Sequence, residues 1–188
     1  VAVRVRAGQW WALSALLVAG ALAGALLPSS ALHWQPTLAY GEPWRAWSAA
    51  FVHWSARHLV ANLAALLLVG ALGAAAGCQG RAVLAWALAW PIGHALLLIQ
   101  PRLLHYGGLS GVLHAGVAVA AWQLVAGARG VRRAIGIAVL GGLALKLLLE
   151  APWAGPVRTV VGWDIPIAPL AHATGALAGL CCAVALRR

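Results

Sequence analysis

The chain has 188 residues, of which 63% are hydrophobic and 9% are charged. A soluble domain carries about 25% charged residues, so this composition argues against a protein that folds in water. The formal net charge is +10, from 13 Lys and Arg against 3 Asp and Glu. In a soluble chain this charge would suggest nucleic-acid binding. Here the basic residues flank apolar runs, which indicates a role in membrane orientation and no nucleic-acid partner.

Six apolar runs follow one another, each close to the roughly 20 residues that a helix needs to span a bilayer. They cover residues 10–27, 58–76, 82–100, 108–128, 134–149 and 167–186. The first run lacks an A-x-A-like cleavage site, so we expect it to remain as a span. The segment 28–57 is rich in Trp and Pro and is expected at the membrane interface. We therefore predict an all-α polytopic membrane protein, with one six-helix transmembrane domain over residues 1–188.

The distribution of Arg residues predicts which ends of the spans face the cytoplasm. Eight fall on one side of the six spans and four on the other. Because basic residues are enriched in cytoplasmic loops, we expect both termini in the cytoplasm, and spans two, four and six then begin on the outer side. The first set is Arg4, Arg6, Arg81, Arg129, Arg132, Arg133, Arg187 and Arg188, and the second is Arg45, Arg57, Arg102 and Arg158.

Polar side chains occur near the outer ends of three of these spans. His58 and Asn62 open the second span, Ser110 and His114 open the fourth, and His172 lies about six residues into the sixth. Polar groups within spans are costly and usually face a bundle interior or a watery cavity. The pattern therefore predicts one site built by three helices.

Ser110 is the candidate nucleophile of this site. A serine in a span is more often a helix-packing residue, but here it lies in Gly108-Leu109-Ser110-Gly111. The glycines permit a sharp turn, and the start of a helix leaves free N–H groups that suit a developing oxyanion. A serine hydroxyl needs a base, and His172 is the best candidate.

His172 is followed at helical spacing by Gly175 and Gly179, a pattern that permits close helix contact. Spans four and six are therefore expected to approach closely enough for a Ser–His hydrogen bond. The alternative is a histidine bonded to a carbonyl of a neighbouring helix. His114 also competes as the base, but it lies on the helix of the serine and is less free to approach it, so we expect it to have a packing role.

His58 and Asn62 are four residues apart and project together from one helix face. As side-chain donors they would supplement backbone N–H groups around an oxyanion. The alternative is a polar pair that holds the second span against its neighbours. Neither a metal nor a cofactor is expected, because the three cysteines fit no metal spacing and no H-E-x-x-H occurs.

Four motifs, in this order, resemble those of the rhomboid intramembrane serine proteases. They cover nearly the whole chain, and together they are far more specific than G-x-S-G alone. The motifs are Glu42-Pro43-Trp44-Arg45 in the first outer loop, His53 with His58 and Asn62, Gly108-Leu109-Ser110-Gly111, and His172 with Gly175 and Gly179.

The resemblance implies a role for each residue. Ser110 would be the nucleophile and His172 the general base of a two-member dyad, with an oxyanion hole of His58, Asn62 and the Ser110 N–H. No acid is expected to complete a triad, because all three lie in loops or at span ends. The substrate would be a transmembrane or C-terminally anchored protein, cleaved from the periplasmic side of a bacterial inner membrane.

His114 departs from the common pattern, in which many bacterial rhomboids carry a Tyr that packs on the catalytic histidine. This difference and the string Gly-Leu-Ser-Gly-Val-Leu-His make the chain most similar to the rhombosortase branch. That branch is thought to process secreted proteins with a C-terminal Gly-Gly signal, an apolar helix and basic residues. The sequence leaves hydrolysis and transpeptidation open.

Three other functions stay open at this point. The chain could be a rhomboid protease of other transmembrane substrates, or a non-catalytic relative that binds transmembrane clients. The presence of both Ser110 and His172 argues against the non-catalytic relative. A transporter could use the same polar residues as a path, although no inverted repeat is evident.

Overall fold

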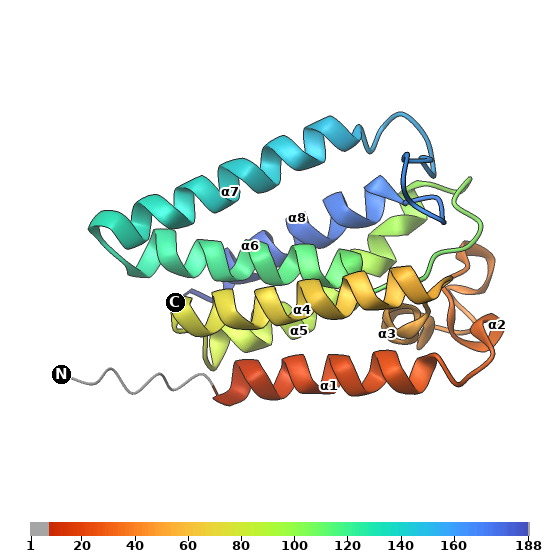
Figure 1. The fold of residues 1–188 in the computed structure, drawn as a ribbon, viewed down its shortest axis with the longest axis horizontal. Helices are drawn as coiled ribbons and strands as arrows, with labels where there is room; N and C mark the ends of the chain where they lie inside the picture. The colour runs from red at the N-terminus through yellow and green to blue at the C-terminus, as the bar shows by residue number, and fades with distance from the viewer. Residues whose placement is uncertain (1–7, 188) are drawn as a thin grey trace.

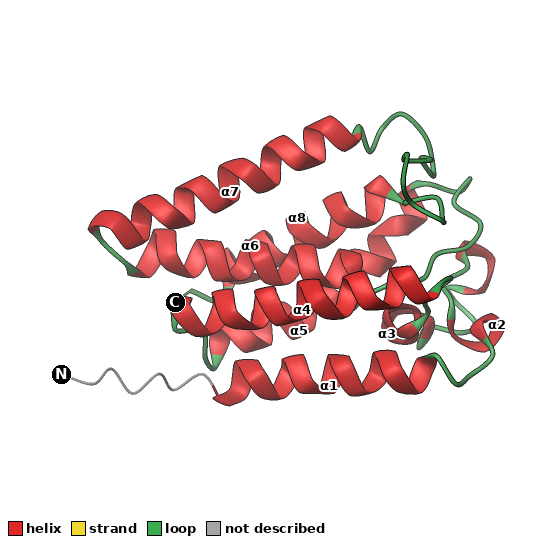
Figure 2. Cartoon of the chain, viewed as in Figure 1, coloured by secondary structure: helices red, strands yellow, loops and turns green. Residues whose placement is uncertain are grey.

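The computed structural model describes residues 8–187 and folds them into helices and loops, with no strand in that range (Figure 1 and Figure 2). Six long helices lie along the long axis of the molecule, and five short helical turns connect them at one end. The long helices are α1 (Gly8–Gly24), α4 (Ala56–Ala76), α5 (Arg81–Ala95), α6 (Ser110–Gly127), α7 (Gly130–Glu150) and α8 (Pro169–Ala185). The short ones are α2 (Ser29–Leu32), η1 (Pro36–Leu38), α3 (Arg45–Ser48), η2 (Ala49–Phe51) and η3 (Leu96–Ile99).

These long helices correspond one to one with the six predicted spans, and the protein is an all-helical membrane bundle as predicted. Three of them, α4, α5 continued by η3, and α6, are long and apolar enough to cross a membrane by themselves, and α1 and α8 are shorter apolar helices. The boundaries differ by a few residues, as α1 ends at Gly24 and α7 reaches Glu150. Three of the Arg residues used to predict the membrane orientation, Arg4, Arg6 and Arg188, lie outside the described residues.

Helix α6 is at the centre of the bundle and contacts α4, α5, α7 and α8. Indole N–H groups help to fix its neighbours. Trp86 of α5 donates to the Val112 carbonyl over 2.8 Å, and Trp10 of α1 donates to the Val69 carbonyl over 3.1 Å. The two indoles stack with centroids 4.3 Å apart. The indole N–H groups of Trp10 and Trp86 are thus paired inside the bundle, as a dry interior favours.

The closest helix approach joins α6 and α8, and glycines make it possible. A Cβ added at Gly175 would lie 2.0 Å from the Gly111 carbonyl oxygen, and one at Gly179 would lie 2.5 Å from the Ala115 oxygen. The small residues predicted to allow close contact therefore do so. The approach brings the first turn of α6 beside the first turn of α8.

The segment between α1 and α4 is held together by Arg45. Its guanidinium is buried and binds the Glu42 carboxylate over 2.6 Å and the carbonyls of Ser30 and His33. The same loop supports the start of α6, because the Gly108 N–H donates to the Ala49 carbonyl over 2.9 Å. The Trp-Arg motif therefore shapes the backbone next to Ser110 without contacting the serine itself.

Candidate active site

Ser110 is the first residue of α6, and the turn before it requires a glycine. Gly108 has φ +139°, in the region that L side chains rarely adopt, and a Cβ there would lie 2.8 Å from Cε1 of His58. Gly111 is also confined, because a Cβ there would lie 2.8 Å from the Ala171 carbonyl oxygen. The Gly-rich turn thus places the serine where helix N–H groups are free.

The structure brings Ser110 and His172 together. The Ser110 Oγ lies 3.0 Å from His172 Nε2, so the hydroxyl can donate to the ring. His172 is buried and lies one turn into α8, and the α6–α8 glycine contact sets its distance from Ser110. This geometry suits a nucleophile and its base.

The expectation that no acid would reach the histidine is wrong. Glu150 Oε2 lies 2.7 Å from His172 Nδ1, and Glu150 Oε1 lies 2.6 Å from Lys146 Nζ. Sequence reasoning excluded the three acids because they lie in loops or at span ends, but Glu150 is the last residue of α7 and its carboxylate points toward His172. The available signal was the Lys-x-x-x-Glu pair at the end of an apolar run, where charges are costly.

The His114 ring lies flat against the ring of His172, the candidate base. The His114 and His172 rings stack with centroids 4.3 Å apart and planes 10° apart. Nδ1 of His114 lies 2.6 Å from the Ser110 carbonyl oxygen, one turn back in its own helix. His114 therefore packs on the His172 ring, and no hydrogen bond joins its own ring to the serine hydroxyl.

The two predicted oxyanion donors, His58 and Asn62, are buried on α4 and line the same cavity as Ser110. His58 Nδ1 accepts a long hydrogen bond, 3.4 Å, from the Trp54 N–H. Asn62 Nδ2 is buried and has no hydrogen-bond partner among the described residues. A buried amide donor without a partner is costly, and such a donor suits an oxygen that arrives with a substrate.

Tyr106 is a neighbour that sequence reasoning missed. Its side chain is buried, its hydroxyl donates to the Gly108 carbonyl over 3.0 Å, and burial raises its pKa to about 12. The phenol therefore stays neutral and braces the turn before the serine. No motif marked it, because a lone Tyr before a Gly pair is common in loops.

A cavity of about 1140 Å³ opens beside these residues, between α4, α6 and α7. The polar groups gather at one end, and aliphatic side chains of α4 and α7 line the rest. The loop 151–168 covers part of it, through side chains that include Val157, Trp163 and Ile165. The arrangement gives a mostly apolar groove with the polar and potentially reactive groups at the end where α6 and α8 begin.

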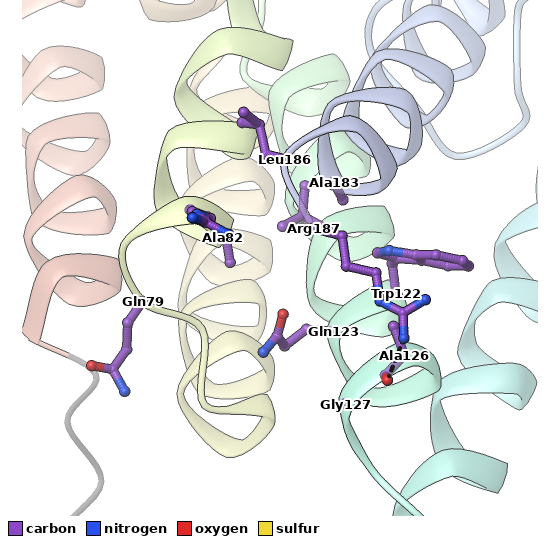
Figure 3. A pocket seen from close by; sticks show the side chains of 11 residues that line it. Gln79, Ala82, Trp122, Gln123, Ala126, Gly127, Ala183, Leu186 and Arg187 are labelled. Atoms are coloured by element: carbon purple, nitrogen blue, oxygen red, sulfur yellow. Dashed lines mark hydrogen bonds between the residues drawn. The ribbon is translucent and has the colours of Figure 1, made fainter.

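A second, smaller pocket lies at the opposite end of the bundle (Figure 3). There Arg187 donates to the Ala126 carbonyl over 3.0 Å and lies over the Trp122 ring. The lining holds no Ser, Cys or His, so this pocket is not a candidate for the chemistry.

His114, Glu150 and His172 also form a group whose ligand atoms lie within 4.8 Å of one another, close enough to consider a metal ion. Both ring nitrogens of His172 already have protein partners, Glu150 and Ser110. The hydrogen bonds and the ring stacking account for this cluster without an ion.

The family model described as Rhomboid domain matches residues 40–188. The chain belongs to the rhomboid family. No curated protein and no solved structure matches it significantly. The matched region contains all the candidate site residues, and only the part before residue 40, which includes α1, lies outside it.

Membership of the rhomboid family establishes the general class of the protein. It is a multi-pass membrane protein of an intramembrane serine protease family whose members act on membrane-embedded substrates.

Proposed function

We propose that this rhomboid-family protein is an intramembrane serine endopeptidase of the rhombosortase type, with Ser110 as nucleophile and His172 as general base. The observation that carries the proposal is the 3.0 Å contact between Ser110 Oγ and His172 Nε2 at the outer end of a large cavity. Acyl transfer by a serine needs a base hydrogen-bonded to the hydroxyl and N–H donors for the oxyanion. The Ser–His pair beside the free helix N–H groups provides both.

The reaction follows from these positions. Ser110 Oγ attacks the scissile carbonyl carbon while His172 Nε2 takes the hydroxyl proton. The oxyanion that forms is stabilised by the Ser110 N–H, Asn62 Nδ2 and His58. The C–N bond then breaks, the leaving amine takes the proton from His172, and water resolves the acyl-enzyme. An amine in place of water would give transpeptidation.

The walls near Ser110 support a Gly-Gly cleavage region. Trp54, His58, His105 and Tyr106 line the same cavity as Ser110, so several bulky rings form the walls of this site. A peptide segment without side chains fits such a site and unwinds more readily than an Ala- or Leu-rich helix. The apolar remainder of the cavity, between α4 and α7, suits the hydrophobic helix that follows the Gly-Gly segment in a sorting signal.

The proposed location is a bacterial inner membrane, with the site open to the periplasm and both termini in the cytoplasm. The Arg distribution supports this orientation. Trp44, Trp47 and Trp54, all exposed, lie at the site end of the bundle, as expected for an interfacial aromatic belt.

The test is cleavage of a reporter domain fused to a Gly-Gly segment, an apolar helix and a basic tail, in proteoliposomes. Ser110→Ala is expected to abolish cleavage and labelling by a serine-directed phosphonate. The matched control is Ser14→Ala, which removes a buried hydroxyl that only bonds the Trp10 carbonyl of its own helix. Cleavage that persists in Ser110→Ala would refute the proposal.

The same assay separates the branch from the wider family. A reporter with Leu-Leu in place of Gly-Gly is expected to resist cleavage. Equal cleavage of both reporters would reject the rhombosortase assignment and favour a rhomboid protease of other transmembrane substrates. Mass spectrometry of the new C-terminus locates the scissile bond and distinguishes a free acid from an amide.

A further inference from the structure

Glu150 stands out among the acidic residues that the structure describes. Its carboxylate bonds both the Lys146 ammonium and His172 Nδ1, whereas Glu42 pairs with Arg45 in the outer loop. The Glu150 side chain is 17% exposed and the Lys146 side chain is 47% exposed. Glu150 is thus turned toward the histidine, while its lysine partner faces outward.

We propose that Glu150 is a positioning residue that completes a Ser110–His172–Glu150 triad, so that this protein does not work as a simple dyad. The inference rests on the proposed protease function and deepens it. The chain of contacts runs from Ser110 Oγ to His172 Nε2 over 3.0 Å, and from His172 Nδ1 to Glu150 Oε2 over 2.7 Å.

The carboxylate fixes which ring nitrogen carries the proton. An ionised carboxylate only accepts hydrogen bonds, so the His172 N–H must be at Nδ1, and Nε2 keeps its lone pair for the serine proton. When Nε2 takes that proton, the ring becomes an imidazolium next to the Glu150 negative charge, which stabilises it. Glu150 keeps its own charge throughout, and the proton passes on from Nε2 to the leaving amine.

The placement of Glu150 is hard to explain as an ordinary ion pair. It is the last residue of α7, where the helix dipole disfavours a negative charge. The Lys146 partner precedes it by four residues, and that order is the weaker one for a helical ion pair. Gly136 is the one buried residue of α7, and it packs against α6, so the Glu150–His172 bond is one of the few polar links between α7 and α8.

The ends of α7 and α8 make the contact possible. Figure 1 shows the C-terminal end of α7 and the N-terminal end of α8 at the same end of the bundle, joined by the loop 151–168. In that loop the Arg158 and Ile167 backbones pair through two hydrogen bonds of 2.8 and 2.9 Å, and Arg158 binds the Leu149 carbonyl over 2.8 Å. These bonds fix the end of α7 next to Glu150.

The test compares Glu150→Gln with Glu150→Asp and with Lys146→Gln, which removes the ion pair but leaves the acid. Each variant is purified as the full chain and assayed for kcat, KM, phosphonate labelling and melting temperature. Glu150→Gln is expected to lower kcat and the labelling rate about 100-fold or more. KM is expected to stay within about twofold, because Gln keeps nearly the size and shape of Glu and the lost interaction is one that strengthens only in the transition state. Glu150→Asp is expected to recover part of kcat, and Lys146→Gln is expected to stay within about threefold of the wild type.

Two results would overturn the inference. In the first, Glu150→Gln keeps kcat within about threefold of the wild type while Ser110→Ala is inactive. That combination would reject the triad but leave the protease proposal intact. The other is a ¹⁵N NMR measurement on the wild-type protein in which the neutral His172 ring is protonated at Nε2. This measurement does not depend on whether any variant folds. A wild-type protein that neither cleaves the reporter nor reacts with phosphonate would instead reject the protease function itself.

Discussion

The contact between α6 and α8 gives a quantitative prediction for Gly175→Ala. The added Cβ would lie 2.0 Å from the Gly111 carbonyl oxygen, whereas Cβ atoms in proteins essentially never come closer than 3.0 Å. Helix α8 must therefore move away from α6 by about 1 Å, since the obstacle is backbone and cannot rotate aside. The cost in stability is expected to be about 1–3 kcal/mol.

That displacement acts directly on the reactive pair. His172 lies one turn before Gly175 on α8, and Ser110 precedes Gly111 on α6, so the 3.0 Å contact between Oγ and Nε2 spans the same interface. A shift of about 1 Å along this contact stretches it to about 4 Å, too long for a hydrogen bond. Misplacement of this size lowers kcat about 100-fold.

The assay is reporter cleavage at saturating substrate, together with the melting temperature in detergent. Gly141→Ala is the matched control, because Gly141 lies in α7 and nothing within 4 Å would contact its Cβ. It is expected to keep kcat and to gain slightly in helix stability. The reasoning is wrong if Gly175→Ala melts at the wild-type temperature, or if it melts lower but retains wild-type kcat.

Two further predictions concern single side chains. Asn62→Ala is expected to lower kcat about 10²- to 10³-fold, because it removes one oxyanion donor. The melting temperature is expected to stay unchanged, because the buried Asn62 Nδ2 has no hydrogen-bond partner to lose. An unchanged kcat would show that Asn62 is not part of the oxyanion hole. Cys78, in the loop between α4 and α5, is fully buried, which raises its thiol pKa to about 12. Since only the thiolate reacts, maleimide labelling of Cys78 at pH 8 should be far slower than labelling of the exposed Cys181, should rise with pH, and should become fast in denaturant. Equal rates for the two native thiols would contradict the burial of Cys78.

The His114 stack shows how a departure from the family pattern keeps its physical role. A ring at this position covers one face of His172, with planes 10° apart, and limits rotation of the base about its own bonds. The covering needs only a flat ring at the right helical spacing, and the His114 imidazole supplies one. The Nδ1 contact with the Ser110 carbonyl in turn fixes the orientation of the His114 ring.

The amino-acid sequence by itself determined the bundle and the main candidates for its chemistry. Within a bilayer every backbone polar group must be satisfied internally, so an apolar run of about 20 residues has few options besides a helix. Spacing then placed Ser110 at a helix start and put Gly175 and Gly179 on one face of another helix. Those local rules explain why the α6–α8 contact was predictable.

Tertiary structure alone decided what surrounds the base. Glu150 is 22 residues before His172, on a helix that packs mainly against α6. The two side chains meet only because the loop 151–168 brings the start of α8 back beside the end of α7. Hydropathy sets the length of a span but not its tilt, rotation or register against its neighbours. A contact that depends on those three variables, such as the one between Glu150 and His172, is therefore visible only once the helices are packed.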